Sequence, residues 1–169
     1  MRTNIYVDGF NLYYGIKDTS FKWLDLGALC RLMLPDDEIH RIRYFTARIK
    51  PRQDDPQKPE RQNTYIRALQ TIPNLSVHYG VFLSHVVRMP VADPPPNTIG
   101  VIRTEEKGSD VNLATFLLTD GFEGDYERAV IISNDSDLVL PVQMVIQKLG
   151  LPVGILNPQR DKSKIARSL

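Results

Sequence analysis

Four aspartates stand where the sequence changes from one kind of element to another. Asp8 follows an apolar run at 5–7, Asp135 and Asp137 follow the apolar run "AVIIS", and Asp110 stands in the first turn of an expected helix. Carboxylates gathered within a few ångströms raise one another's pKa and resist joint ionisation. Hard divalent cations relieve that repulsion and prefer oxygen ligands. If the four acids meet, one or two Mg²⁺ or Mn²⁺ ions would be their natural partners, and such ions activate water and clamp the oxygens of a phosphodiester.

Each of these acids also has a simpler interpretation. Asp8 and the glycine after it form a common turn pair, and Asp110 would be an ordinary acid in a first helical turn. Asp135 and Asp137 would serve as a turn residue and a helix cap. The fold decides between the two interpretations, because ligands of an open α/β sheet bind outside the carboxyl ends of its strands. In a parallel sheet all four acids would meet at that edge.

Alternating strand and helix patterns predict such a sheet. Strands are expected at 5–7, 39–49, 75–83, 99–108, 127–134 and 151–157, and helices at 25–34, 60–72, 109–122 and 137–150. This order is typical of a mainly parallel sheet with helices on both faces. Between the elements, "PRQDDPQKP" and "MPVADPPPNTIG" are expected to be proline-rich loops.

Composition indicates one soluble domain. The chain has 169 residues, 42% of them apolar and 24% charged, which are ordinary values for a globular protein. No apolar run approaches the roughly 20 residues of a membrane span, and the N-terminus does not read as a secretory signal. The single cysteine, Cys30, excludes an intramolecular disulfide and is expected in the core of a helix. These features predict a cytoplasmic protein that does not enter a membrane.

The formal net charge is only +1, but its distribution is uneven. Residues 41–67 hold eight basic residues against three acidic ones. That excess fits either a solvated helix face or a surface for a polyanion. The C-terminal stretch "PQRDKSKIARSL" begins like a helix with few apolar residues to pack, so the domain is expected to continue beyond Leu169.

Three stretches together resemble a known family. "IYVDGFNLYY", "EEKGSDVNLA" and "VIISNDSDLVLPVQ" are similar, in order and spacing from about residue 3 to 157, to the NYN domain in its bacterial LabA-like form, a branch of the PIN-like metal-dependent nucleases. The resemblance implies one domain over residues 1–169 with a Rossmann-like three-layer α/β/α architecture. It also implies ribonuclease chemistry on Mg²⁺ or Mn²⁺.

The resemblance assigns roles residue by residue. The catalytic, metal-binding acids map onto Asp8, Asp110, Asp135 and Asp137. Asn11 matches the polar residue of the first motif, where it would orient Asp8 or a metal-bound water. Related domains carry a further helix after the last motif, which agrees with a domain that continues past the end of this chain.

Basic residues near the expected strand ends are candidates for binding single-stranded RNA. Lys107 would contact the scissile phosphate, and Arg43, Arg48 and Arg103 would form a basic wall beside the metal. The two tyrosines after the first motif could stack on bases or pack in the core. A homodimer is a reasonable expectation, since nuclease paths are often built between subunits.

The sequence leaves three functions to compare. A metal-dependent endoribonuclease comes first, and a non-catalytic RNA-binding or regulatory module with the same fold is the alternative. A binder of polyanions gains nothing from buried negative charge, which argues against that alternative. A phosphatase of the haloacid dehalogenase type needs a second aspartate two residues after the first, where this chain has Phe10.

Overall fold

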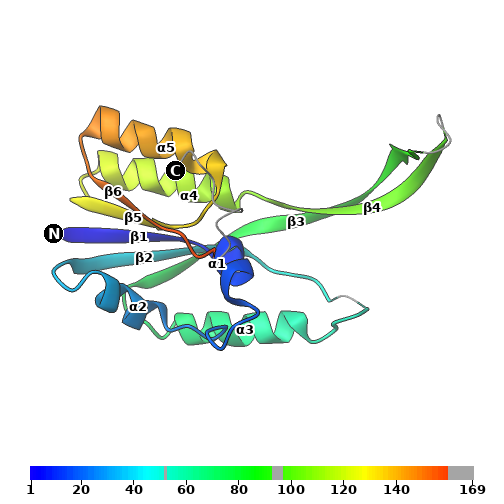
Figure 1. The fold of residues 1–169 in the computed structure, drawn as a ribbon, viewed down its shortest axis with the longest axis horizontal. Helices are drawn as coiled ribbons and strands as arrows, with labels where there is room; N and C mark the ends of the chain where they lie inside the picture. Colours follow the sequence, from blue (N-terminus) through cyan, green and yellow to red (C-terminus); the bar gives the residue numbers. More distant parts are fainter. Residues whose placement is uncertain (52, 93–96, 160–169) are drawn as a thin grey trace.

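The computed structural model describes residues 1–51, 53–92 and 97–159 (Figure 1). Most of the C-terminal stretch for which a helix was expected lies outside these ranges. The described residues form an α/β fold around a curled, mixed six-stranded sheet in the order β4-β3-β2-β1-β5-β6. The strands are β1 (Arg2–Asp8), β2 (Glu38–Ala47), β3 (Leu75–Pro90), β4 (Thr98–Lys107), β5 (Arg128–Ile132) and β6 (Val153–Leu156).

Five neighbouring strands of this sheet run parallel, and the edge strand β4 is antiparallel to β3. The expectation of a mainly parallel sheet is therefore met in its central part. The strand β1 lies in the middle, because it pairs with β2 on one side and with β5 on the other. Its run of apolar and β-branched residues is buried on both faces, as a central strand requires.

Helices cover both faces of the sheet (Figure 1). One face carries α1 (Gly9–Ile16), α2 (Leu26–Met33) and α3 (Lys58–Leu69). The other carries α4 (Ser109–Phe122) and a helical segment made of the 3₁₀ turn η1 (Ser136–Leu138), α5 (Val139–Met144) and the π-helical turn η2 (Val145–Leu149). Within the described part of the chain, no helix has the length and apolar character needed to cross a membrane.

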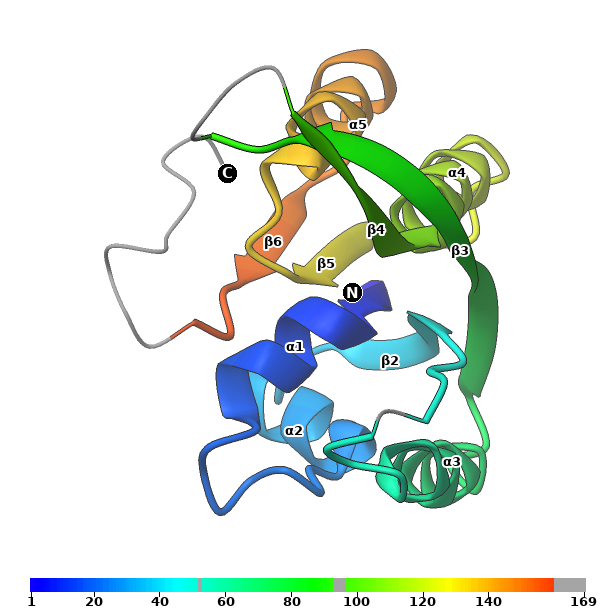
Figure 2. The same cartoon turned by 90° about the vertical axis from the view of Figure 1, so that its right-hand side faces the viewer.

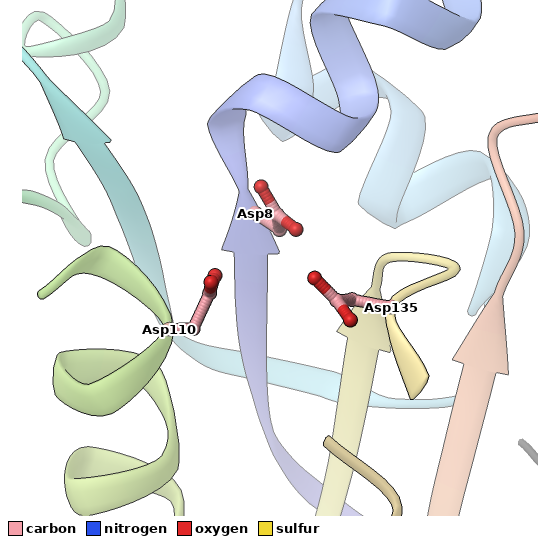
Figure 3. A group of neighbouring side chains, drawn as sticks. All are labelled: Asp8, Asp110 and Asp135. Carbon is pink, nitrogen blue, oxygen red and sulfur yellow. The ribbon is translucent and has the colours of Figure 1, made fainter. Parts of the chain in front are cut away.

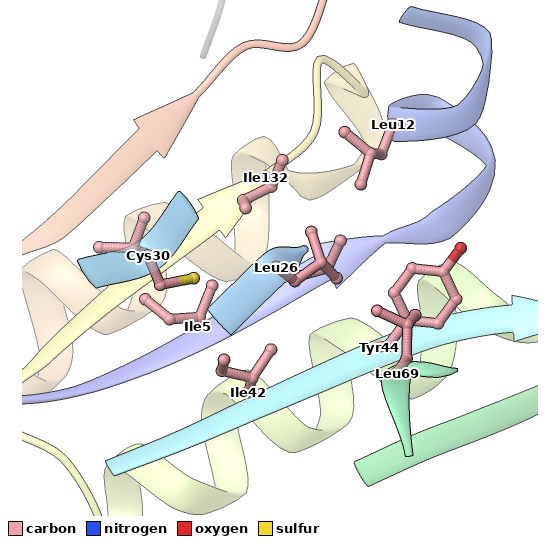
Figure 4. Close-up of a cluster of buried hydrophobic side chains, with 10 residues drawn as sticks. Ile5, Leu12, Leu26, Cys30, Ile42, Tyr44, Leu69 and Ile132 are labelled. Atoms are coloured by element: carbon pink, nitrogen blue, oxygen red, sulfur yellow. The ribbon is translucent and has the colours of Figure 1, made fainter. Parts of the chain in front are cut away.

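Two apolar clusters join these helices to the sheet. On the α1–α3 face, Leu26, Cys30 and Leu69 pack against Ile5 and Ile42 (Figure 4). Cys30 is 1% exposed, which confirms its expected place in a helical core. The second cluster holds α4 and η2 against the other face; its members include Leu113, Leu117, Val145, Tyr6 and Phe45.

Two local expectations were incomplete. The helix α1 was not expected, because glycine and aromatic residues have low helix propensity. Asp8 compensates by capping it: the carboxylate accepts a hydrogen bond from the Asn11 backbone N–H at 2.9 Å. The expected helix at 137–150 is divided into η1, α5 and η2, and it ends at Gly150, whose φ of 69° suits glycine.

The outer part of β3 and the whole of β4 form a ribbon that projects from the body of the protein (Figure 1). We call this ribbon, residues 81–90 and 98–107, the arm. The expected strand at 75–83 was too short, since β3 continues to Pro90 and pairs there with β4 alone. Apolar side chains at its outer part stay exposed, Val86 at 70% and Ile102 at 75%.

Candidate metal centre

Three carboxylates from distant parts of the chain converge at the carboxyl edge of the sheet (Figure 3). Asp8 ends β1, Asp110 lies in the first turn of α4, and Asp135 follows β5. Each offers one carboxylate oxygen, and these atoms all lie within 4.8 Å of one another. The sheet topology produces this meeting, because β1 and β5 are parallel neighbours and α4 begins at the same edge.

Asp8 is the buried member of the group, 5% exposed. One of its oxygens accepts the Asn11 backbone N–H and the other accepts the Ser133 hydroxyl, both at 2.9 Å. These two bonds fix the carboxylate in one orientation. A buried polar group so held is preorganised to receive a ligand rather than free to turn away.

A network of hydrogen bonds orders the loop after β5. Ser133 Oγ accepts the Asp135 backbone N–H at 3.1 Å, so the same hydroxyl holds both Asp8 and Asp135. The side-chain oxygen of Asn11 accepts the Asn134 backbone N–H at 3.1 Å. Asn11 therefore links α1 to this loop, and its role in orienting Asp8 or a metal-bound water stays a prediction of the resemblance.

Asp137 is placed differently from the other three acids. Its backbone N–H donates to the Asp135 carboxylate at 2.9 Å, which makes Asp135 the cap of η1. Its own side chain is exposed and does not belong to the group of converging oxygens. Its charge is still close enough to raise the pKa of Asp110.

The position of Asp110 depends on the junction between β4 and α4. Gly108, with a φ of 96°, turns the chain into the helix. The Glu106 carboxylate accepts the Ser109 backbone N–H at 3.1 Å and the Ser109 hydroxyl at 2.8 Å. Gly80 of β3 packs against this junction so closely that a Cβ there would lie 2.6 Å from the Lys107 carbonyl oxygen.

The electrostatics of the metal-free group are unfavourable to full ionisation. Burial raises the pKa of Asp8 above its ordinary value, against hydrogen bonds from Asn11 and Ser133 that lower it. Burial, followed by the charges of Asp8 and Asp135, raises the pKa of Asp110 to about 6. A divalent cation among the three oxygens would remove the repulsion that causes part of these shifts.

The donor set fits a hard cation. All three converging groups are carboxylates, the ligands that Mg²⁺ and Mn²⁺ prefer, and none of the chain's histidines belongs to the group within the described residues. Opposite ligands of Mg²⁺ lie about 4.2 Å apart, since each sits about 2.1 Å from the ion. Oxygens already within 4.8 Å of one another need only small adjustments to reach that geometry.

The three acids line one side of a cleft of about 1030 Å³. Phe82, Ser84, Thr104 and Glu106 from the base of the arm also line it. Another side of its wall comes from α1, α3 and the loops beside them; it includes Tyr13, Tyr14, Lys22, Trp23, Lys50, Lys58 and Arg61. The cleft thus joins an acidic floor to an aromatic and basic wall.

The basic residues that the sequence put forward lie elsewhere. Arg43 makes a two-bond ion pair with Asp120, at 2.7 and 2.8 Å, on the α4 face of the sheet. The guanidinium of Arg48 lies over the Tyr79 ring, 5.0 Å from its centroid. Arg103 and Lys107 both pair with Glu105 on the arm. None of the four lines the cleft.

Several residues of the cleft were not singled out from the sequence. Lys50, Lys58 and Arg61 lie in the basic segment 41–67, so the uneven charge was a usable signal for them. Trp23 and Lys22 lie in the loop before α2 and carried no such signal. Ser133 was read as part of a strand, and its bridging role follows only from the pairing of β1 with β5.

Comparison with known proteins identifies the domain and its fold. The family model described as "NYN domain" matches residues 2–168. A solved structure from Vibrio parahaemolyticus RIMD 2210633, of the protein of unknown function VPA0982, superposes with a TM-score of 0.57 at 17% identity. That superposition covers 91% of this chain and 79% of the other, and it supports the fold alone.

A curated relative is also similar. It is the 6-hydroxy-3-succinoylpyridine 3-monooxygenase HspA of Pseudomonas putida (strain DSM 28022 / S16), which is 28% identical over 197 aligned residues. The match covers 99% of this chain and 63% of the relative, so the chain spans less than two thirds of the length of that protein.

Proposed function

Because this chain belongs to the NYN domain family, we propose that it is a metal-dependent endoribonuclease of the LabA-like branch, with a PIN-like three-layer architecture. The observation that supports this most is the convergence of Asp8, Asp110 and Asp135 at the carboxyl edge of the sheet. The NYN family is generally nuclease-like, and an all-carboxylate group suits the Mg²⁺ or Mn²⁺ ions that such chemistry uses.

In this proposal Asp8, Asp110 and Asp135 hold the ion, and Asp137 acts from the rim of the site. A bound Mg²⁺ or Mn²⁺ would supply an activated water and would neutralise charge on the phosphodiester. The protein's own task is to keep the carboxylates in place. Asn11 and Ser133 do this through the hydrogen bonds that fix Asp8 and the loop after β5.

The proposed substrate is RNA, with single-stranded RNA as the expected form. The cations of the cleft wall, among them Lys50, Lys58 and Arg61, support a polyanionic substrate. A non-catalytic RNA-binding module is the alternative, and the acidic floor argues against it, because carboxylates without a cation repel phosphates. The expected homodimer stays a prediction; light scattering would then give twice the 19.3 kDa of one chain.

The name of the Pseudomonas relative concerns oxygen insertion into a hydroxypyridine. Such chemistry needs an electron-carrying cofactor or a redox metal. Iron oxygenases commonly bind their metal with two histidines and one carboxylate. The converging group described here consists of three carboxylates, which favours the nuclease proposal over that activity for this chain.

The test of the proposal is metal-dependent cleavage of labelled RNA by the wild type and by Asp8→Asn and Asp135→Asn. Each substitution removes a charged ligand but keeps a side chain of the same shape. We expect Mn²⁺-dependent cleavage to fall by at least about a hundredfold, the loss typical of a removed catalytic electrostatic group. Asp36→Asn is the matched control, since Asp36 is exposed and does not belong to the metal-binding group.

The same variants test whether these acids serve stability instead. Replacing Asp8 or Asp135 relieves repulsion in the metal-free site. The variants should therefore unfold at a temperature no lower than the wild type in EDTA. Unchanged cleavage, or a marked loss of thermal stability without metal, would contradict the proposal.

A further inference from the structure

The cleft is larger than a metal ion and one phosphate require. Its volume of about 1030 Å³ is at the upper end of the roughly 300–1,000 Å³ of ordinary ligand pockets. The acids come from β1, α4 and the loop after β5. A second side of the cleft is formed by α1, α3 and the loops beside them, and these two helices lie on the opposite face of the sheet from α4 (Figure 2). The chemistry of this second side differs from that of the acidic side.

Three aromatic side chains of that side are exposed. Tyr13 is 39% exposed, Tyr14 56% and Trp23 51%, and all three line the cleft. Neither tyrosine is part of the core, although the sequence allowed one of them that place. Aromatic rings that face a water-filled cleft offer flat apolar surfaces on which another ring can stack.

Trp23 is held in place by α3. The Tyr65 hydroxyl donates to the Leu24 carbonyl oxygen at 2.8 Å, and the Tyr65 ring lies 6.1 Å from that of Trp23, edge to face. These contacts attach the loop before α2 to the helix. The indole is therefore presented on a supported loop, with little ordering left to occur on binding.

Cations accompany the aromatic rings. Lys58 Nζ lies 5.6 Å from the centroid of the Tyr13 ring, and Arg61 pairs with Asp55 in an exposed ion pair. An exposed pair is worth little, so a phosphate can compete for Arg61. Lys22 and Lys50 make no ion pair with any residue that the structure describes. Positive charge here is available to an anionic ligand.

A second hollow lies next to the cleft, on the other side of Trp23. It has a volume of about 410 Å³ and is lined by Trp23, Gln57, Glu60, Arg61 and Thr64. Trp23 and Arg61 line both hollows. The indole and the guanidinium thus lie between two recesses, as they would along a path for an extended ligand.

We propose that the wall formed by Tyr14, Trp23, Lys58 and Arg61 is a binding path for the unpaired nucleotides next to the cleaved bond. Trp23 stacks on a base, and Lys58 and Arg61 bind phosphates. The inference rests on the proposed function for its substrate class. Alternating aromatic and cationic groups suit a single strand, because only unpaired bases present a free face for stacking.

Trp23 is also the reporter for the test, since it is the one tryptophan of the chain. The experiment follows its fluorescence in the Asp135→Asn protein, so that RNA is not consumed. We expect a single-stranded octanucleotide to quench the fluorescence in a saturable way. A dinucleotide, which is long enough only for the metal centre, should quench much less.

Variants in the same Asp135→Asn background measure the contribution of each group. Stacking of one base is worth about 1–3 kcal/mol, so Trp23→Ala should weaken octanucleotide binding about 5-fold to 150-fold, measured by anisotropy of a labelled RNA. Lys58→Ala should weaken binding and reduce its dependence on salt. Phe122→Ala and Lys148→Ala are the matched controls, an aromatic residue and a lysine that are exposed outside both hollows.

The outcomes separate this inference from the proposed function. Binding that leaves Trp23 fluorescence unchanged, or a duplex that quenches as well as the single strand, would overturn the path. So would quenching by 6-hydroxy-3-succinoylpyridine but not by RNA, which would assign the wall to a small heterocycle. If the octanucleotide quenches as expected but the wild type cleaves no RNA with Mn²⁺, the path stands and the catalytic proposal fails.

Discussion

At the scale of single residues, the site is an arrangement of acids whose joint ionisation is unfavourable without a cation. Asp8 is buried and Asp110 is close to it, so burial and repulsion raise the pKa of both. Neither acid has an ion-pair partner among the described residues. Elsewhere the chain pairs its buried acid, as Asp120 does with Arg43. The contrast supports the proposal that the converging acids bind a cation.

This arrangement predicts how the stability of the metal-free protein depends on pH. The pKa of Asp110 is raised from 3.8 to about 6, mainly by burial, so the folded state holds its proton more tightly than the unfolded state. The resulting stabilisation is complete below the unfolded pKa and is lost as the pH rises through about 6. In EDTA, Asp110→Asn should thus become more stable than the wild type above that pH, by about 1 kcal/mol for a partly solvated group.

Urea unfolding of both proteins at a series of pH values checks this prediction. The difference in unfolding free energy should grow between roughly pH 4 and pH 6 and then level off. Saturating Mn²⁺ at neutral pH should reverse its sign, because the ion binds the carboxylate and not the amide. A difference that is the same at every pH would show that Asp110 does not titrate in this way.

The residues that could be predicted from sequence are those whose position depends only on the order of elements. Asp8, Asp110 and Asp135 could be expected to meet because each follows a strand or begins a helix. Asp137 was expected with them, but its exposed side chain does not belong to the converging group.

Arg43 could not be placed, because its partner Asp120 is 77 residues away and meets it only when α4 packs on β2. A side chain in the middle of a strand points to one face of the sheet or the other. The sequence alone did not show which side chain of a covering helix would contact Arg43 on that face.

At the scale of elements, the position of Asp110 depends on the close packing of β3 against the start of α4. A Cβ at Gly80 would lie 2.3 Å from Glu106 Oε1, 2.6 Å from the Lys107 carbonyl oxygen and 2.9 Å from the Ser109 nitrogen. Two of these neighbours are backbone atoms and cannot move alone. Gly80→Ala should thus displace α4, lower stability by about 1–3 kcal/mol and weaken Mn²⁺ binding.

Gly100→Ala is the matched control for that variant. Gly100 lies on β4 in the arm, and a Cβ there would meet only Val86 Cγ1 at 3.5 Å, an ordinary contact. Its effect on stability should be small or favourable, since alanine suits a strand better than glycine does. Thermal unfolding and Mn²⁺ titration of both variants check the pair. If the two variants had the same stability and the same Mn²⁺ affinity, the junction between β4 and α4 would tolerate movement.

The arm was the element that sequence patterns described least well. Its second strand, Thr98–Lys107, lies close to the expected 99–108, but the first was expected to end at about residue 83 rather than at Pro90. The proline-rich segment between them indicated a long loop. Pairing between β3 and β4 decides the actual lengths, and it is not visible in either strand alone.

At the scale of the whole molecule, a bound cation would connect β1, α4 and the loop after β5. A ligand that binds only the folded state at 100 times its Kd adds about 2.7 kcal/mol of stability. For a domain of this size that corresponds to a rise in Tm of roughly 5–10 °C. We expect Mn²⁺ to produce such a rise in the wild type, and EDTA to remove it.

The same measurement on Asp135→Asn supplies the control. The variant retains the fold and loses one ligand, so its Tm should respond far less to Mn²⁺. If Mn²⁺ raises the Tm of both proteins by the same amount, the ion binds somewhere other than the converging carboxylates. Differential scanning fluorimetry over a series of Mn²⁺ concentrations is sufficient to decide.

The overall architecture could be predicted in its parallel part, and its mixed character could not. Alternation of strands and helices determines that β1, β2, β3, β5 and β6 run in one direction, since each crossover passes through helical residues. The sequence between the third and fourth strands shows no helical pattern, which allows an antiparallel hairpin. Because the segment between these two strands is rich in proline, the sequence alone did not distinguish an antiparallel hairpin from a long loop.

The central place of β1 has a consequence for how the protein is made. Asp8 is synthesised well before its neighbour Asp135, which follows the strand β5 that brings it there. Until that late strand joins β1, the carboxylates of the nascent chain stay apart. Under the proposed ribonuclease function, a growing chain would therefore have no cleavage activity before synthesis has passed residue 135.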